Sequence, residues 1–323
     1  MDHNRRAALG MAGACAGLLA AGGGRASPAW PSQPVRLLAP YSAGGTVDLV
    51  ARIIADDLSW SLPQRVFLEN RTGGGTTIAA MAVAGAAPDG HTLLYSTLAQ
   101  ATMRALHPKL PIDVGAALAP VSYIGSVPIA LAVNGAVPAR TVQEFIALLR
   151  ANPGKYDYAS PGVGTPPHLA AELFSYMAGV KMTHVPYRGS GSSFSDVAAG
   201  TVPVIFVSGL SVARQPNLRV LAIASLRRAS AMPAIPTLHE EGLHGLEAYS
   251  WHMVFAPSAT PAEVQERIGR AVDRSVTKPE IRARLAEQEI QPVGGTPADA
   301  RRFFEAERDR WERTLRETDL MAR

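Results

Sequence analysis

The chain has 323 residues, of which 47% are hydrophobic and 18% charged, and its formal net charge is +4 at pH 7. This length is enough for two packed domains, and the 25 prolines and 29 glycines predict many short loops. Because the net charge is small and only 6% of the residues are aromatic, the composition argues against a protein that binds nucleic acid.

Residues 1–26 have the pattern of a signal peptide. Arg5 and Arg6 precede a small and apolar run, Ala7–Gly24, and a small-residue cleavage pattern follows, with the cut expected after Ala26 or, alternatively, after Ala29. The run is rich in alanine and glycine and only moderately hydrophobic, which favours an exported protein over a membrane anchor. We therefore expect an exported protein that leaves the cytoplasm by the twin-arginine route or by general secretion.

The only cysteine, Cys15, lies inside this segment. The mature chain therefore has no thiol nucleophile, no disulfide and no cysteine metal site, and we expect it to use no cofactor. The segment Met11–Cys15 is faintly similar to a lipoprotein cleavage box, so lipidation of Cys15 stays open.

Apolar runs of strand length alternate with helical patterns along the rest of the chain, which predicts an α/β fold with a mostly parallel sheet. The expected strands are Val35–Ala39, Val66–Glu69, Thr92–Tyr95, Ile129–Val133, Tyr158–Ser160, Met182–Pro186, Val204–Phe206, Val220–Ala224 and Met253–Ala256. Helix starts that have a capping threonine and an acidic residue three positions later are expected at Thr141, Thr260 and Thr296.

A glycine-rich turn follows the first expected strand. Gly44 and Gly45 stand between that strand and a segment in which Val47, Val50 and Ile54 recur at helical spacing. Paired glycines let the backbone come close to a ligand, and the free N–H groups at the positive end of the helix dipole suit an anion. The alternative is a tight turn that needs glycine only for its dihedral angles, and this segment alone does not decide between the two.

The same design recurs later in the chain. The strand that ends at Ser160 leads into the loop Gly162–Gly164, and Thr165 stands at the N-cap of a helix. Pro166 and Pro167 occupy the first helical positions, where a missing N–H costs nothing. Two such units that face each other would clamp a small carboxylate between two lobes.

Enzyme motifs are missing from the sequence. It has no His-Glu-x-x-His, no Gly-x-Ser-x-Gly elbow and no Walker lysine, and Gly73–Gly75 fails the dinucleotide pattern because Ile78 stands where the last glycine belongs. We therefore expect a protein that is not an enzyme. An exported hydrolase that uses Ser160, His168 and Asp157 as a triad is a distant alternative.

Several short motifs, taken in order along the chain, are specific as a set. They are Tyr41–Asp48 with Ala51-Arg52, Glu69–Gly75 followed by Ala87–Leu94, Ser160–Leu169 with Glu172–Phe174, His184–Gly189, Ala229–Pro236, Phe255–Pro257 and Pro292–Thr296. This ordered set covers essentially the whole mature chain. It resembles the Bug (TctC-like) extracytoplasmic solute-binding receptors of the tripartite tricarboxylate transporter family.

That resemblance implies a two-lobed periplasmic binding protein of the type II-like, Venus flytrap kind, in which each lobe is a mostly parallel sheet flanked by helices. Lobe one would combine about residues 30–132 with 253–323, and lobe two would be residues 133–252, with hinge crossovers near Val133 and Trp251. Such receptors close their lobes on a small mono-, di- or tricarboxylate or a related organic acid. The implied partners are membrane transporter subunits (TctA/TctB-like) or, alternatively, a sensor kinase, and the receptor itself is expected to be a monomer.

Carried over by matched position, the resemblance implies a ligand site built from loop residues of both lobes. The implied residues are Tyr41, Ser42, Ala43, Gly44, Gly45, Asp48, Gly75, Thr76, Thr77, Thr97, Ser160, Gly164, Thr165, His168, Tyr187, Arg188, Gly189 and Ser208. Asp48 would hold loop amides, with simple helix capping as an equal alternative. Arg188 would pair with a ligand carboxylate, with a salt bridge at the cleft rim as the alternative. His168 and Glu172 share one helix face, but no third ligand completes a metal site, so we expect capping or packing roles and no bound metal.

Two positions depart from the family pattern. Val207-Ser208-Gly209 follows the strand that ends at Phe206, where the family commonly has an acidic residue, and Val202-Pro203 replaces a polar pair before that strand. An acid at this place would suit the ammonium group of an amino acid. Its absence favours a plain carboxylate or an aromatic acid as the ligand.

Overall fold

The structure is a computed structural model, and it describes residues 30–209, 211–229 and 232–318. The predicted signal peptide, with Arg5, Arg6 and Cys15, lies outside these residues. The strands are β1 (Val35–Ala39), β2 (Val66–Asn70), β3 (Thr92–Ser96), β4 (Leu118–Asn134), β5 (Asp157–Ser160), β6 (Thr183–Pro186), β7 (Val204–Ser208), β8 (Leu218–Ile223), β9 (Tyr249–Pro257) and β10 (Gln291–Pro292). The helices are α1 (Thr46–Ser61), η1 (Gly74–Thr76), α2 (Thr77–Ala84), α3 (Ala99–Leu106), α4 (Val114–Ala117), α5 (Val142–Ala151), α6 (Pro166–Ala178), α7 (Ser190–Ala198), η2 (Ser211–Arg214), α8 (Ala262–Thr277), α9 (Pro279–Glu287) and α10 (Pro297–Glu317), where η marks a short 3-10 helix.

All the predicted strands are present, but β4 is much longer than expected. It begins at Leu118 instead of near Ile129, and β9 also begins earlier than predicted. Within β4, Pro120, Gly125 and Pro128 interrupt the apolar pattern, because proline and glycine are typical of strand ends and bulges. The first half of this strand is therefore hidden from an analysis of the sequence, and the two-residue strand β10 was not predicted.

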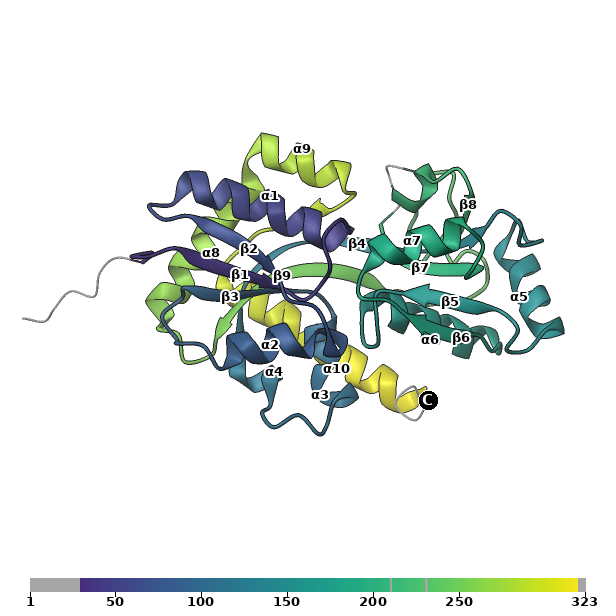
Figure 1. Cartoon of the computed structure of the whole chain (residues 1–323), viewed down its shortest axis with the longest axis horizontal. Coiled ribbons are helices and arrows are strands. Elements are labelled where there is room, and N and C mark those ends of the chain that lie inside the picture. The colour runs from purple at the N-terminus through teal and green to yellow at the C-terminus, as the bar shows by residue number, and fades with distance from the viewer. Residues whose placement is uncertain (1–29, 210, 230–231, 319–323) are drawn as a thin grey trace, which may run out of the picture.

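The strands form one continuous sheet in the order β2-β1-β3-β9-β4-β7-β5-β6, with β8 and β10 paired to β4. Residues 118–128 of β4 pair with β9, and residues 129–134 pair with β7 and β8. Figure 1 shows the result as two lobes joined by these long strands. We call the half with β1, β2 and β3 lobe one and the half with β5 to β8 lobe two. The predicted α/β fold with two lobes is confirmed, and the predicted residue boundaries of the lobes stay predictions.

The sheet as a whole is mixed, whereas the strands that belong to one lobe alone pair mostly in parallel, as predicted. β1 pairs in parallel with β2 and β3, and β5 pairs in parallel with β6 and β7. β4 and β9 are antiparallel to each other and to their other neighbours. The reason is that one strand carries the chain into lobe two and the other returns it, so the two must run in opposite directions.

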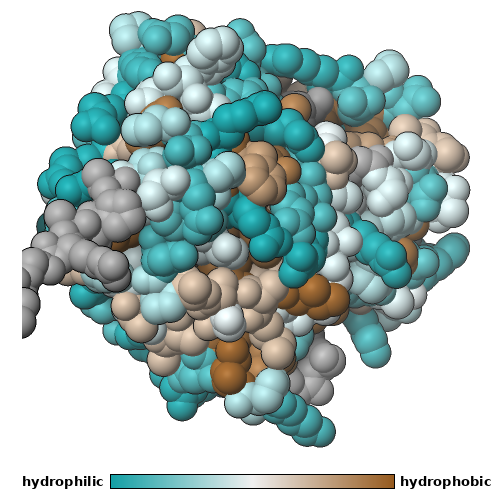
Figure 2. Space-filling model, turned by 60° about the vertical axis from the view of Figure 1, so that its left-hand side comes forward, coloured by the Kyte–Doolittle hydropathy of each residue, from teal (hydrophilic) through white to brown (hydrophobic). Residues whose placement is uncertain are grey.

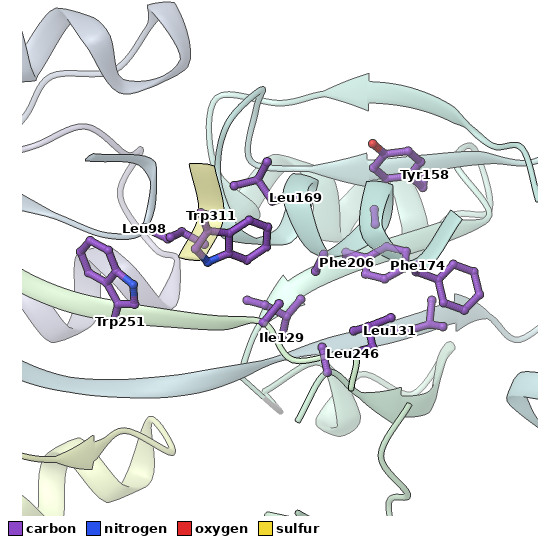
Figure 3. Packing of buried hydrophobic residues seen from close by; sticks show 14 of the residues in the cluster. Leu98, Ile129, Leu131, Tyr158, Leu169, Phe174, Phe206, Leu246, Trp251 and Trp311 are labelled. Atoms are coloured by element: carbon purple, nitrogen blue, oxygen red, sulfur yellow. The ribbon is translucent and has the colours of Figure 1, made fainter. Parts of the chain in front are cut away.

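Helices cover both faces of the lobe-one sheet (Figure 1). One core lies under α1, α8 and α9 and contains Val50, Ile54 and Val272. A second core lies on the other face and extends into lobe two, so that Trp251 and Trp311 belong to the same cluster as residues of α6 and β7 (Figure 3). Since this core spans the connection between the lobes, the lobes share buried contacts near β4 and β9.

The helix starts follow the predicted capping patterns in two places and not in the third. Thr296 forms a full capping box with Asp299, and the Thr141 hydroxyl accepts the amide N–H of Glu144. The capping box predicted at Thr260 is wrong, because Pro261 is the N-cap of α8 and the Thr260 hydroxyl has no hydrogen-bond partner. Threonine there stands one residue too early for the reciprocal bonds of the box.

The surface is mostly hydrophilic on the face in Figure 2, with smaller hydrophobic areas between the polar ones. Among the helices that the structure describes, none combines the length and the apolar character that crossing a membrane requires.

Candidate ligand-binding cleft

A small cavity lies where loops of the two lobes meet. It is lined by Tyr41, Ser42, Gly45, Thr46, Val47, Pro161, Pro166, Pro167, Ser208 and Ser250. The first five come from the β1–α1 loop and the first turn of α1, and the next three come from the β5–α6 loop and the first turn of α6. The cavity volume is about 10 Å³, roughly the space of one water molecule. The two strand–loop–helix units that the sequence singled out therefore do face each other across a narrow cleft.

The N-terminus of α1 offers backbone donors to this cleft. Its N-cap residue, Gly45, has no side chain, and no side-chain oxygen caps the helix. The amides of Thr46 and Val47 lie in the first turn, where a helix provides no acceptor for them. The Thr46 hydroxyl donates to the carbonyl oxygen of Ser208 at 3.2 Å, which links α1 to the end of β7 in lobe two. This geometry suits a carboxylate oxygen at the positive end of the helix dipole.

Asp48 holds the loop before α1 in shape. Its carboxylate accepts from the Gly44 amide at 3.0 Å, from Arg52 Nε at 3.0 Å and from Asn70 Nδ2 at 2.8 Å. Burial works to raise the pKa of Asp48, but these hydrogen bonds outweigh it and hold the pKa below its ordinary value. Asn70 also donates to the carbonyl oxygen of Tyr41 at 2.9 Å. Of the two roles predicted for Asp48, holding a loop amide is the one that the contacts support.

The α6 side of the cleft is built differently from the α1 side. Thr165 is the N-cap as predicted, but its hydroxyl donates to the Gly162 carbonyl oxygen at 2.6 Å instead of capping the helix. Pro166 and Pro167 have no N–H, so the first turn of α6 presents its dipole and few amides. The Gly164 amide donates to His168 Nδ1 at 3.3 Å, which confirms the expected local role for His168.

The hydroxyl of Ser160 is directed at a histidine that the sequence did not suggest. Its Oγ lies 2.7 Å from His184 Nε2, and no bond joins it to His168. Burial lowers the pKa of His184 to about 4, and burial with the nearby His184 lowers the pKa of His168 to about 3. Both imidazoles are therefore neutral at pH 7. The imagined pairing of Ser160 with His168 for hydrolysis is wrong.

His168 and Glu172, which lie four residues apart on α6, do not form a metal site. Glu172 Oε1 accepts from the Tyr158 hydroxyl at 2.6 Å, so its carboxylate is engaged elsewhere. Within the described part of the chain, no group of three or more His, Cys, Asp or Glu side chains gathers in a way that would hold a metal ion.

Three further contacts bring the lobes together around the cleft. The Ser42 amide donates to the Arg188 carbonyl oxygen at 3.3 Å. Gly189 packs so tightly on Ser42 that an added Cβ would lie 1.8 Å from the Ser42 hydroxyl oxygen. At Gly75, an added Cβ would lie 2.8 Å from the Val163 carbonyl oxygen. Residues without side chains are therefore required where the loops cross.

Thr76 combines two features that are typical of functional loops. Its φ is +81°, a left-handed conformation that a β-branched residue rarely adopts. Its hydroxyl is buried without a hydrogen-bond partner. Strained residues persist where the surroundings or a ligand require them. The neighbouring Thr77 hydroxyl, in contrast, donates to the Gly74 carbonyl oxygen at 2.8 Å within its own loop.

Several predicted site residues lie near the cleft without lining the cavity. The Tyr187 hydroxyl donates to Asp196 at 2.6 Å, and burial with this carboxylate raises the Tyr187 pKa to about 12. The Thr97 hydroxyl lies 2.6 Å from the hydroxyl of Tyr41, and both residues are buried. The side chain of Arg188 is exposed. The other predicted residues outside the cavity lining are Ala43, Gly44, Asp48, Gly75, Thr76, Thr77, Ser160, Gly164, Thr165, His168 and Gly189.

The cavity also includes residues that the prediction omitted. Thr46 and Val47 stand inside the first glycine motif, so that motif already contained their signal. Ser250 carried no signal, because the strand that contains it was expected to begin only at Met253. Ser208, in contrast, was predicted and does line the cavity.

Comparisons with known proteins agree on one family. A family model described as "Tripartite tricarboxylate transporter family receptor" matches residues 50–320. The protein BugT of Bordetella pertussis is 34% identical over 311 residues, which cover 94% of this chain and 95% of BugT.

Two similar solved structures carry small acids in their titles. An R. palustris protein titled "Rpa4515 with adipate" has a TM-score of 0.86 and 33% identity, and the match covers 90% of this chain and 98% of that one. MatC from Rhodopseudomonas palustris, titled "with bound malate", has a TM-score of 0.83 and 28% identity, and the match covers 88% of this chain and 99% of that one.

Proposed function

Since the chain belongs to the tripartite tricarboxylate transporter receptor family, we propose that it is a periplasmic receptor that captures a small carboxylate between its lobes. It would deliver this acid to the membrane subunits of a tripartite tricarboxylate transporter. The membership bears out the resemblance drawn from the motifs, and it bears out the expectation that the chain is not an enzyme. The observation that carries the proposal is the N-terminus of α1, because its first-turn residues Thr46 and Val47 line a cleft between two lobes and their amides have no acceptor within the helix.

The two sides of the cleft would bind the ligand by different means. On the α1 side, the amides of Thr46 and Val47 would donate to one carboxylate. On the α6 side, Pro166 and Pro167 leave mainly the helix dipole, so this side would attract the charge without direct amide contacts. Arg188 is exposed beside the cleft and would supply a positive charge to a second carboxylate. The adipate and malate carried by the two solved relatives are dicarboxylates, which fits this division.

The lining of the cavity favours a plain organic acid over an amino acid. Among the described residues that line it, none carries a carboxylate to receive an ammonium group. The nearest acid, Asp48, is occupied by Gly44, Arg52 and Asn70. Malate carries a hydroxyl group where aspartate carries an ammonium group, so titration with the two acids tests this preference. Tighter binding of aspartate than of malate would contradict it.

Movement of the lobes would accompany binding, because the cavity is too small for a dicarboxylate and the lobes would have to open to admit one. A second cavity of about 820 Å³ lies on the other side of β9. Tyr249 lines this second cavity and Ser250 lines the cleft, and successive strand residues point to opposite faces of a sheet. The second cavity is lined by residues of both lobes, for example Arg282 of α9 in lobe one and Leu226 after β8 in lobe two. Rotation about β4 and β9 would open one cavity while it narrows the other.

The direct test removes one amide from the α1 terminus. Val47→Pro deletes the N–H at the second helical position, and Pro167 of α6 shows that this chain accepts proline there. Val47→Ala is the control, because it shortens the side chain but keeps the amide. Loss of one hydrogen bond to a charged group costs about 1.5–3 kcal/mol, so affinity for adipate or malate should fall about ten- to hundredfold in Val47→Pro only.

Calorimetric titration of residues 27–323 with both acids gives the readout. Equal affinities for Val47→Pro and Val47→Ala would refute carboxylate binding at α1. Uptake of the bound acid by cells with and without the receptor tests delivery to a transporter. If uptake is unchanged while binding is intact, the receptor would instead serve a membrane sensor.

A further inference from the structure

We propose that Ser250 is a specificity-determining residue whose hydroxyl donates a hydrogen bond to the ligand carboxylate at the α1 end of the cleft. The proposal rests on the proposed function, because it assumes that a carboxylate enters this cleft. It goes further by assigning a donor to β9. The family-like motifs include this strand only from Phe255 onward, so they place none of its earlier residues at the site.

The first observation is that Ser250 is fully buried and its hydroxyl has no partner. The residue has 0% relative exposure, and Ser250 Oγ forms no hydrogen bond within the described structure. Most buried polar side chains have at least one partner, and an unsatisfied buried hydroxyl lowers stability. A ligand can complete such a group where the group lines a binding cleft. Ser250 meets that condition, because it lines the cleft.

The second observation is the place of Ser250 relative to α1. Gly45, Thr46 and Val47 line the same small cavity as Ser250, so the first turn of α1 and this serine border one space. An ionised carboxylate only accepts hydrogen bonds, and it has room for several donors. The amides approach it from the helix end, and the hydroxyl of Ser250 approaches it from the sheet. The two kinds of donor would thus bind one carboxylate from different sides.

The backbone of Ser250 is fixed, which makes its hydroxyl a well-placed donor. Ser250 pairs with Val127 in the antiparallel β4–β9 ladder, and both residues are fully buried. Donors held on regular strands are positioned more precisely than donors on loops. Because β9 belongs to the strands that join the lobes, Ser250 stays beneath the cleft whichever lobe moves.

Other residues of the sheet show why Ser250 is singled out. Two residues further along β9, His252 shares its face, but His252 Nδ1 is 2.7 Å from the Tyr95 hydroxyl and the residue does not line the cleft. Ser122 on β4 is also fully buried with an unpartnered hydroxyl, and it does not line the cleft either. Ser122 is therefore the matched control, because it differs from Ser250 in access to the ligand and not in burial.

The experiment compares three variants of the mature chain by calorimetric titration with adipate and with malate. Ser250→Ala removes the donor, Ser250→Cys nearly preserves the volume with a much weaker donor, and Ser122→Ala removes an equivalent hydroxyl away from the cleft. We expect affinity to fall about ten- to hundredfold in both Ser250 variants, by a similar factor for the two acids, and to stay at the wild-type value in Ser122→Ala. The ligand-free unfolding midpoint should not fall in either alanine variant, because no hydrogen bond within the chain is lost.

The outcomes separate this proposal from the proposed function. Wild-type affinity in Ser250→Ala would overturn the role of Ser250 while the receptor function stands. An equal loss in Ser122→Ala would also overturn it, because the effect would then come from the sheet and not from contact with the ligand. If the wild-type protein binds neither acid nor any other carboxylate, the proposed function itself fails.

Discussion

Gly189→Ala should weaken ligand binding by keeping the lobes apart. An added Cβ at Gly189 would lie 1.8 Å from Ser42 Oγ, 3.0 Å from Ser42 Cβ and 3.2 Å from the Ser42 amide nitrogen. The backbone of Gly189 is extended, with φ of 160° and ψ of 171°, so alanine can adopt it without strain. The substitution therefore acts on the contact between the loops and not on the conformation of Gly189.

The size of the effect follows from the displacement that the methyl group imposes. An ordinary contact begins at 3.4 Å, so the Ser42 hydroxyl must turn away from its contact at 1.8 Å. The Ser42 Cβ at 3.0 Å and the Ser42 amide nitrogen at 3.2 Å must each retreat by a few tenths of an ångström. The hydrogen bond from the Ser42 amide to the Arg188 carbonyl oxygen, now 3.3 Å long, would be lost. Loss of this neutral hydrogen bond costs about 1 kcal/mol of binding free energy. A ligand that both loops hold would also lose one charge-assisted hydrogen bond, which costs about 1.5–3 kcal/mol more. The affinity should fall by about two to three orders of magnitude.

The assay is calorimetric titration with the dicarboxylate that binds the wild-type protein most tightly. Gly85→Ala is the control, because its added Cβ meets only Met81 O at an ordinary 3.5 Å and the site lies away from the cleft. A double variant, Gly189→Ala with Ser42→Gly, removes the two closest clashing atoms and should regain much of the affinity. Wild-type affinity in Gly189→Ala, or no recovery in the double variant, would refute the reasoning.

Two further predictions concern buried groups around the cleft. Tyr41→Phe deletes a hydroxyl that lies 2.6 Å from the hydroxyl of Thr97. The free energy of urea unfolding should fall by about 1–3 kcal/mol, because the buried Thr97 hydroxyl loses its partner. If the added substitution Thr97→Val recovers none of this stability, the Tyr41–Thr97 pair is not the cause of the loss. Burial lowers the pKa of His252 to about 3, so below pH 6.5 the unfolded chain binds a proton that the folded chain does not, and stability falls as the pH decreases. His252→Gln should reduce this slope between pH 6.5 and 5 by up to about 1.4 kcal/mol per pH unit, and an unchanged slope would show that His252 does not resist protonation.

Local sequence was sufficient for the parts of the site that depend on neighbours along the chain. The glycines before α1, the threonine N-cap of α6 and the capping box at Thr296 were all predicted where the structure has them. Each depends on dihedral preferences and hydrogen bonds within a few residues, which the sequence specifies directly. The ordered motifs likewise led to the family that the comparisons found.

Tertiary structure alone decided which of these parts meet. Ser160 bonds to His184 instead of His168 because the parallel β5–β6 pairing brings Ser160 and the neighbouring strand together. Ser250 reaches the cleft only because β9 pairs with β4 beneath the α1 loop. The mixed sheet has the same origin, since strand direction follows from how the chain crosses between the lobes. Such contacts join residues that are distant in the sequence, and no local preference fixes them, because their free energy arises only when the whole sheet has formed.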